Sequence, residues 1–140
     1  MIFGSQFTLE NINNLSANTI VEHLGIEITD IGSDTLTGKM PVDARTKQPF
    51  GLLHGGASVV LAETLGSIAS NGVINSDLNA VVGLEINANH IKSAKNGFVT
   101  GIAKPVHIGK RTHVWEIRIK NENEDLICIS RFTAAIIDKK

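Results

Sequence analysis

The chain has 140 residues, of which 42% are hydrophobic, and its formal net charge at pH 7 is −1. This length and composition suit a single domain that buries roughly 70% of the surface of its unfolded chain. The near-neutral charge argues against a nucleic-acid-binding protein. The sequence has neither the pattern of a signal peptide nor an apolar span of about 20 residues, so we expect a cytoplasmic protein with no membrane contact.

Cys128 is the single cysteine, so no internal disulfide can form, and no metal-ligand spacing surrounds it. It lies in an apolar stretch, which indicates a packed core thiol rather than a nucleophile. We therefore expect no metal site and no cofactor.

Two short helices and six strands are predicted around a longer central helix. Thr8 is a typical N-cap, and it predicts a helix with Leu15 on its apolar side. A second helix is expected over residues 18–24, with Ile20 turned inward and an end at Gly25. Alternation of apolar and polar residues predicts strands over residues 26–31, 35–42, 80–89, 97–106, 112–120 and 126–137.

The central helix is predicted over residues 56–69, about four turns, because every position but one there is apolar, small or uncharged. A helix that is apolar on every side belongs in a core, and Gly66 within it allows a sheet to approach closely. The exception is Glu63, the only formally charged side chain between Lys47 and Asp77.

This helix has features of an active site. Glutamate is seldom buried without a partner or a task, and a carboxylate in a dry environment has a raised pKa that suits acid–base catalysis. Ser67 lies one turn beyond Glu63 on the same face. Before the helix, His54, Gly55 and Gly56 offer backbone N–H groups that can bind an oxyanion. Taken singly, the glycines suit a tight entry turn and the glutamate a solvated face, but together they favour catalysis.

One helix with about six mostly antiparallel strands predicts an α+β domain, in which the sheet wraps round the helix. Nothing in the sequence marks a domain boundary, so residues 1–140 are expected to form one domain. The strand over residues 80–89 mixes polar with apolar side chains. Such a strand suits a subunit interface or a ligand cleft better than a free edge.

Four segments carry a resemblance to a known family: residues 40–43 (Met-Pro-Val-Asp), 45–56 (Arg-Thr-Lys-Gln-Pro-Phe-Gly-Leu-Leu-His-Gly-Gly), 61–63 (Leu-Ala-Glu) and 82–90 (Val-Gly-Leu-Glu-Ile-Asn-Ala-Asn-His). Together they closely resemble the hotdog-fold acyl-CoA thioesterases. The nearest branch contains the 1,4-dihydroxy-2-naphthoyl-CoA thioesterases and the thioesterases that proofread enterobactin synthase. The likeness covers nearly the whole chain.

The resemblance implies hydrolysis of an aromatic acyl-CoA, such as 1,4-dihydroxy-2-naphthoyl-CoA or a hydroxybenzoyl-CoA, with a link to menaquinone biosynthesis. It also implies a dimer of dimers, with each site built across a dimer interface. By the family's pattern Glu63 is the nucleophile or the general base. Gln48 and His54 of the other subunit would bind the thioester carbonyl or the attacking water. The Gly55 N–H would polarise the carbonyl, and Ser67 would orient the acyl group or water.

CoA is then part of the substrate rather than a cofactor. The family's CoA-binding positions fall on Gly83, His90, Ile91, Lys92, Ser93, His107, Ile108, Gly109, Lys110, Arg111 and Thr112. The basic residues among them would meet the CoA phosphates, and solvated turn charge is the alternative. Gly109 would open backbone N–H groups to a phosphate. His113 lies one residue beyond the match and is left out.

Residues 68–79, where relatives shape the acyl pocket, leave the natural acyl group open. A hotdog 3-hydroxyacyl hydratase or dehydratase, or a non-enzymatic acyl-CoA-binding protein, is the alternative function. The order of Gln48, His54 and Glu63 fits hydrolysis better than hydration. The intact carboxylate argues against a binder that lost its activity. No Gly-x-Ser-x-Gly motif occurs, which argues against an α/β-hydrolase.

Overall fold

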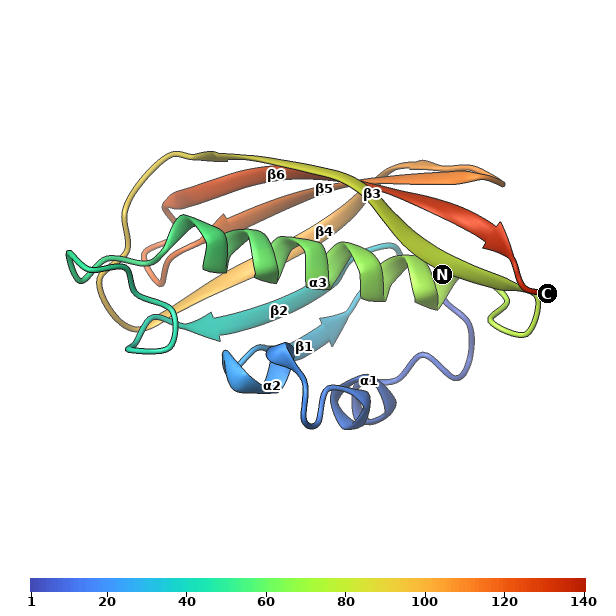
Figure 1. Cartoon of the computed structure of the whole chain (residues 1–140), viewed down its shortest axis with the longest axis horizontal. Coiled ribbons are helices and arrows are strands. Elements are labelled where there is room, and N and C mark those ends of the chain that lie inside the picture. The colour runs from blue at the N-terminus through green and yellow to red at the C-terminus, as the bar shows by residue number, and fades with distance from the viewer.

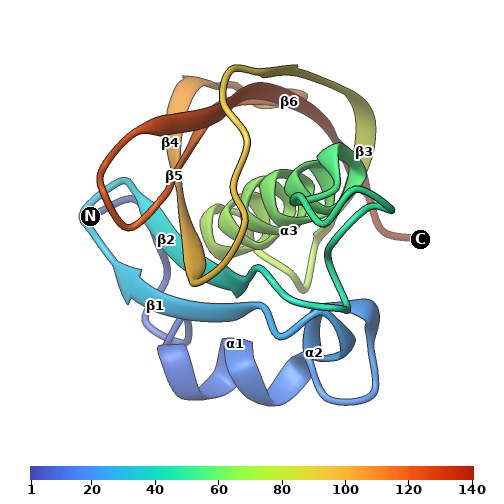
Figure 2. The ribbon, with the colours of Figure 1, turned by 90° about the vertical axis from the view of Figure 1, so that its left-hand side faces the viewer.

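The computed structural model describes residues 1–140. Its elements are α1 Leu9–Leu15, α2 Ile20–His23, β1 Glu27–Ile31, β2 Leu36–Pro41, α3 Gly55–Val73, β3 Asn79–His90, β4 Phe98–Ile108, β5 Thr112–Lys120 and β6 Leu126–Asp138. The strands form one sheet in the order β1-β2-β4-β5-β6-β3, and every neighbouring pair is antiparallel. The sheet curves round α3, while α1 and α2 lie outside β1 (Figures 1 and 2). The predicted α+β hotdog architecture is confirmed.

Helix α3 is longer than predicted, because His54 caps its start and it continues to Val73. It lies against the concave face of the sheet, where Leu61 and Leu65 are fully buried. Gly66 faces the ring of Phe132, and a Cβ atom built on Gly66 would lie 2.5 Å from that ring. The small residue is therefore what lets helix and sheet come this close.

The core under α3 contains one buried polar group of three residues. The Ser70 hydroxyl on α3 accepts a hydrogen bond of 2.7 Å from Trp115 Nε1 and lies 3.0 Å from His113 Nδ1. Burial is the main cause that lowers the pKa of His113, with a smaller contribution from His107 and an opposing hydrogen bond to the Gly109 backbone. His113 is thus a core residue that ties β5 to α3.

Cys128 is buried as predicted, and its burial raises the pKa of the thiol, which fits a packed side chain rather than a nucleophile.

Helix α1 begins at the predicted cap and buries Ile12, but each N-terminal helix leaves one side chain exposed that was predicted to face inward. Thr8 accepts a hydrogen bond from Asn11 N–H, and Thr19 caps α2, so α2 starts later than residue 18. Leu15 is 82% exposed and Ile20 is 57% exposed, so the expectation that they face inward is wrong. Both helices are too short to bury a full apolar stripe.

The two edges of the sheet differ. At the β1 edge, the Asn13 side chain of α1 donates to the Ile28 C=O and accepts from the Ile28 N–H, both at 3.1 Å. The other edge, β3, pairs only with β6 and is covered by no other element. Val82 and Leu84 on it are 43% and 59% exposed.

No helix of the chain is long and apolar enough to span a membrane.

Candidate active site

Glu63 lies on the middle of α3, beside strand β3. Its side chain is exposed in the single chain, so the prediction of a buried carboxylate is wrong for the isolated subunit. The carboxylate lies over Gly83, where an added Cβ atom would be 3.0 Å from Glu63 Oε2. Gly83, predicted to bind CoA, therefore borders the carboxylate that is predicted to be catalytic. An exposed acid next to an uncovered strand edge is open to substrate or to another subunit.

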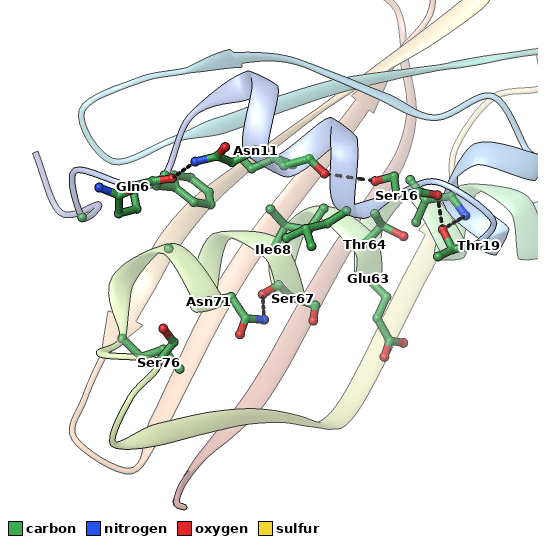
Figure 3. A pocket seen from close by; sticks show the side chains of 17 residues that line it. Gln6, Asn11, Ser16, Thr19, Glu63, Thr64, Ser67, Ile68, Asn71 and Ser76 are labelled. Atoms are coloured by element: carbon green, nitrogen blue, oxygen red, sulfur yellow. Dashed lines mark hydrogen bonds between the residues drawn. The ribbon is translucent and has the colours of Figure 1, made fainter.

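A cleft of about 780 Å³ runs along α3 beneath the N-terminal segment. Its lining combines apolar side chains from both sides with a polar row on α3 (Figure 3). The row consists of Glu63, Ser67 and Asn71, four residues apart, so they share one face of the helix. The cleft thus brings together two of the predicted catalytic residues, Glu63 and Ser67.

The start of α3 forms a second group of predicted residues. His54 Nδ1 accepts a 2.8 Å hydrogen bond from the Gly56 N–H, which leaves Nε2 as the free nitrogen of the ring. The Gly55 N–H has no acceptor within the chain. Only one of the two glycine N–H groups expected to bind an oxyanion is therefore available. His90 adjoins it, since a Cβ atom on Gly55 would lie 2.8 Å from His90 Nε2.

Gln48 lies in the same neighbourhood, in a cleft of about 350 Å³. Several residues predicted for catalysis or CoA binding line this cleft, namely Gln48, Gly55, His90, Ile91, Lys92 and Ser93. The side-chain oxygen of Gln48 accepts a 2.5 Å hydrogen bond from the Phe50 N–H. The amide NH2 of Gln48 is therefore the group left to bind a ligand, and it can only donate.

The two groups are too far apart to form one site in one chain. Gly55 and Glu63 are eight residues apart in a continuous helix, which corresponds to about 12 Å along its axis. A thioester carbonyl needs its polarising donor and its attacking group within about 3 Å. The predicted catalytic residues of each chain therefore fall into two groups, or half-sites, one at the start of α3 and one at its middle.

The two segments predicted to bind CoA also lie apart. His90 pairs with Cys128 at one end of β6, whereas Thr112 pairs with Ala135 at the other end. In one chain the segments 90–93 and 107–112 therefore stand at opposite ends of the sheet.

The basic side chains of these two segments differ in whether they are free to bind an anion. Lys92 Nζ donates to Asp125 at 2.8 Å, and this hydrogen bond is the main cause that lowers the pKa of Asp125. Lys110 and Arg111 are exposed and form no ion pair. The Gly109 N–H, expected to face a phosphate, donates to the Thr112 C=O instead. The basic side chains of the β4–β5 turn remain free for an anion.

Asn71 is a cleft residue in the segment 68–79, which was expected to shape the acyl pocket, but no individual role was predicted for it. Its spacing from Glu63 and Ser67 was the available signal, because position 71 continues the same helical face. No group of three or more His, Cys, Asp or Glu side chains is placed to hold a metal ion.

A sheet wrapped round one helix, with a carboxylate at the helix middle and a capped glycine turn at its start, defines the hotdog class of thioesterase. The chain belongs to the thioesterase superfamily, whose family model matches residues 50–128. Among its relatives, the 1,4-dihydroxy-2-naphthoyl-CoA hydrolase of Escherichia coli is 53% identical over 98% of this chain and 100% of that protein. The proofreading thioesterase EntH of Cronobacter turicensis is 49% identical over 98% of this chain and 99% of its own length.

Solved structures agree with this assignment. A mutant thioesterase from Pseudomonas aeruginosa has a TM-score of 0.97 and 44% identity, covering 99% of this chain and 100% of its own. A thioesterase from Haemophilus influenzae has a TM-score of 0.95 and 48% identity, covering 99% of this chain and 96% of its own. The predicted family, fold and class of enzyme are confirmed, and the protein is a thioesterase.

Proposed function

We propose that the protein hydrolyses aromatic acyl-CoA thioesters at sites that each combine half-sites from two subunits. The separation of about 12 Å between the Gly55 N–H and Glu63 carries this proposal, because one carbonyl cannot meet both in the same chain. The bare β3 edge supports it, since two such edges can pair in one continuous sheet. Glu63 of one subunit would then face Gln48, His54 and Gly55 of the other.

The chemistry needs only these groups and water. The Gly55 N–H and the free donors of Gln48 and His54 stabilise the negative charge that develops on the thioester oxygen. Glu63 takes a proton from water, whose oxygen bonds to the carbonyl carbon, or it attacks that carbon itself. The C–S bond then breaks, and CoA leaves as a thiolate that gains a proton. In the second route, water hydrolyses the resulting anhydride at Glu63.

The aromatic acyl group is proposed from two observations. The cleft beside Glu63 has the volume of a small-molecule site and mixes apolar with hydrogen-bonding side chains. The relatives from Escherichia coli and Cronobacter turicensis carry names that refer to dihydroxynaphthoyl-CoA hydrolysis and to proofreading. A role in menaquinone biosynthesis would follow if 1,4-dihydroxy-2-naphthoyl-CoA is the preferred substrate.

A thiol-release assay over aryl-, short-chain and long-chain acyl-CoAs tests the proposal. We expect the highest kcat/KM with an aryl-CoA. Glu63→Gln should lower kcat by about 10²–10⁴-fold, because the charge is lost while the shape is kept. The control is Glu124→Gln, which removes an exposed turn carboxylate and should have no effect. A Glu63→Gln enzyme within threefold of the wild type contradicts the mechanism.

Isotope labelling can demonstrate the nucleophilic route for Glu63. In a single turnover in water enriched in ¹⁸O, a nucleophilic Glu63 whose anhydride is hydrolysed at the glutamyl carbon acquires the label, and the acid product receives an unlabelled oxygen from Glu63. A general base, or an anhydride hydrolysed at the acyl carbon, gives labelled product and an unlabelled Glu63. Mass spectrometry of the acid and of the peptide containing Glu63 reads both results.

A further inference from the structure

We propose that Asn71 selects acyl groups that carry a hydroxyl, by accepting a hydrogen bond from that hydroxyl in the cleft along α3. This inference rests on the proposed acyl-CoA hydrolysis and adds a specificity-determining residue to it. Asn71 belongs to none of the motifs that carry the family resemblance.

The orientation of the Asn71 amide is set within the helix. Its Nδ2 donates a 2.9 Å hydrogen bond to the Ser67 C=O one turn earlier. The nitrogen is therefore engaged, and no donor of the chain reaches the amide oxygen. Figure 3 shows the Asn71, Ser67 and Glu63 side chains on the same side of α3. Asn71 thus presents an acceptor, with no partner of its own, to the cleft that holds the catalytic carboxylate.

The spacing along α3 matches the reach of an aromatic acyl group. Ser67 and Asn71 lie about 6 Å and 12 Å beyond Glu63 along the helix axis. Helical side chains tilt toward the N-terminus, so the amide of Asn71 reaches back over the turn of Ser67. A thioester carbonyl at Glu63 therefore places an aryl ring beside Ser67 and its distal substituent at Asn71.

The charges in the cleft favour an uncharged donor. Glu63 is its only formally charged residue, and no lysine, arginine or histidine lines it. An acyl group with a carboxylate would find no cation there. A phenolic hydroxyl can donate to the Asn71 oxygen, while its ring packs on apolar neighbours such as Ile68 and Phe7.

The test compares benzoyl-CoA with 2-, 3- and 4-hydroxybenzoyl-CoA on the wild type and on Asn71→Leu. One hydrogen bond of about 0.5–1.5 kcal/mol corresponds to a factor of about two to twelve in kcat/KM. We expect the wild type to prefer at least one hydroxybenzoyl-CoA by such a factor. In Asn71→Leu the ratio should fall to about one, because leucine has a similar size and no acceptor.

Two controls keep the result interpretable. Asn14→Leu changes the same residue type at an exposed position of α1 outside the cleft, and it should keep the wild-type ratio. Thermal unfolding checks that Asn71→Leu folds, and Asn71→Ala serves if it does not. A ratio that survives both Asn71 substitutions, or a wild type with no preference, overturns the inference.

A binding measurement separates this inference from the proposed function. Calorimetry with the Glu63→Gln protein compares Kd for benzoyl-CoA and the hydroxybenzoyl-CoAs without turnover, with and without Asn71→Leu. A wild type that hydrolyses no acyl-CoA contradicts the proposed function alone, while the Kd ratio still decides on Asn71. Turnover without any hydroxyl preference contradicts only the role of Asn71.

Discussion

At the scale of single residues, internal hydrogen bonds decide which polar atoms remain for a ligand. His54 Nδ1 and the Gln48 oxygen are used within their own loop, which leaves donors at the start of α3. The nitrogen of Asn71 is used within the helix, which leaves its amide oxygen as an acceptor two turns beyond Glu63. Donors suit an oxygen that gains negative charge, and a carboxylate suits the proton of a water molecule. The two half-sites therefore supply complementary chemistry.

The free basic residues of the β4–β5 turn lead to a prediction about binding. Changing Lys110 and Arg111 to alanine should raise KM for CoA thioesters several-fold and leave kcat nearly unchanged. Contacts to the nucleotide phosphates lie far from the breaking bond, so they change little in the transition state. The same variant should hydrolyse an N-acetylcysteamine thioester as well as the wild type does. Equal losses on both substrates would show that this turn does not bind the nucleotide.

The buried His113 leads to a prediction about pH. Its pKa in the folded protein is lowered from 6.5, mainly by burial, so the unfolded chain binds the proton more readily. The free energy of unfolding should therefore fall as the pH drops below about 6.5, and level off once the pH is below the folded pKa. Denaturant unfolding between pH 8 and pH 5 measures this slope. His113→Gln should flatten it, whereas His23→Gln, at an exposed helix position, should not.

At the scale of elements, the contact between α3 and the sheet depends on small residues. Gly66 faces Phe132, and Gly38 and Gly101 leave room for Leu65, since Cβ atoms at these two would lie 3.0 Å and 2.8 Å from its side chain. Such close packing holds the helix at one height and one rotation over the strands. The polar row of α3 therefore faces the cleft, and its apolar side faces the sheet.

Gly66→Ala tests this contact. Alanine favours an isolated helix by about 1 kcal/mol over glycine, but its methyl group would overlap the Phe132 ring. Overpacking of this kind costs about 1–3 kcal/mol, so we expect a lower Tm and a lower free energy of unfolding. As a control, Asn71→Ala changes an exposed position of the same helix and should leave Tm nearly unchanged. A Gly66→Ala protein as stable as the wild type would mean that helix and sheet can move apart freely.

At the scale of the whole molecule, the residues predicted to bind and hydrolyse the substrate lie at separate places in the single chain. The half-sites lie at two points of α3, the predicted CoA segments lie at opposite ends of the sheet, and the β3 edge is bare. An antiparallel partner across β3 would bring the start of one α3 toward the middle of the other. The same arrangement would bring one CoA segment of each subunit toward the other's.

Subunit mixing tests this division of the site. Glu63→Gln and Gln48→Ala chains are each expected to be inactive alone. A hybrid dimer regains one complete site, so random mixing in equal amounts should restore about a quarter of wild-type activity. The activity is measured after unfolding and refolding the two chains together, and separately refolded chains provide the baseline. A fully active monomer in solution would contradict the composite site.

Local pattern was enough to predict most elements. The apolar run predicted α3, alternation predicted six strands, and the thioesterase motifs predicted the fold and the class of reaction. Periodicity reports on neighbours within a turn or a strand pair, which is why these predictions agree with the structure. The ends of α3 and α2 were missed because capping by His54 and Thr19 depends on side-chain hydrogen bonds that periodicity does not contain.

Only the tertiary structure shows that Glu63 is exposed, that His113 is buried, and that Gly55 and Glu63 cannot act together in one chain. Glu63 is exposed because β3 is the last strand of the sheet, and strand order depends on pairing between residues distant in sequence. The buried place of His113 likewise depends on a contact with Ser70, 43 positions away in the chain. The distance between Gly55 and Glu63 follows from a straight helix. Whether a second subunit can bring such groups together depends on which edge of the sheet stays unpaired, and only the strand order shows that this edge is β3. These are long-range properties of packing, and a single sequence does not display them.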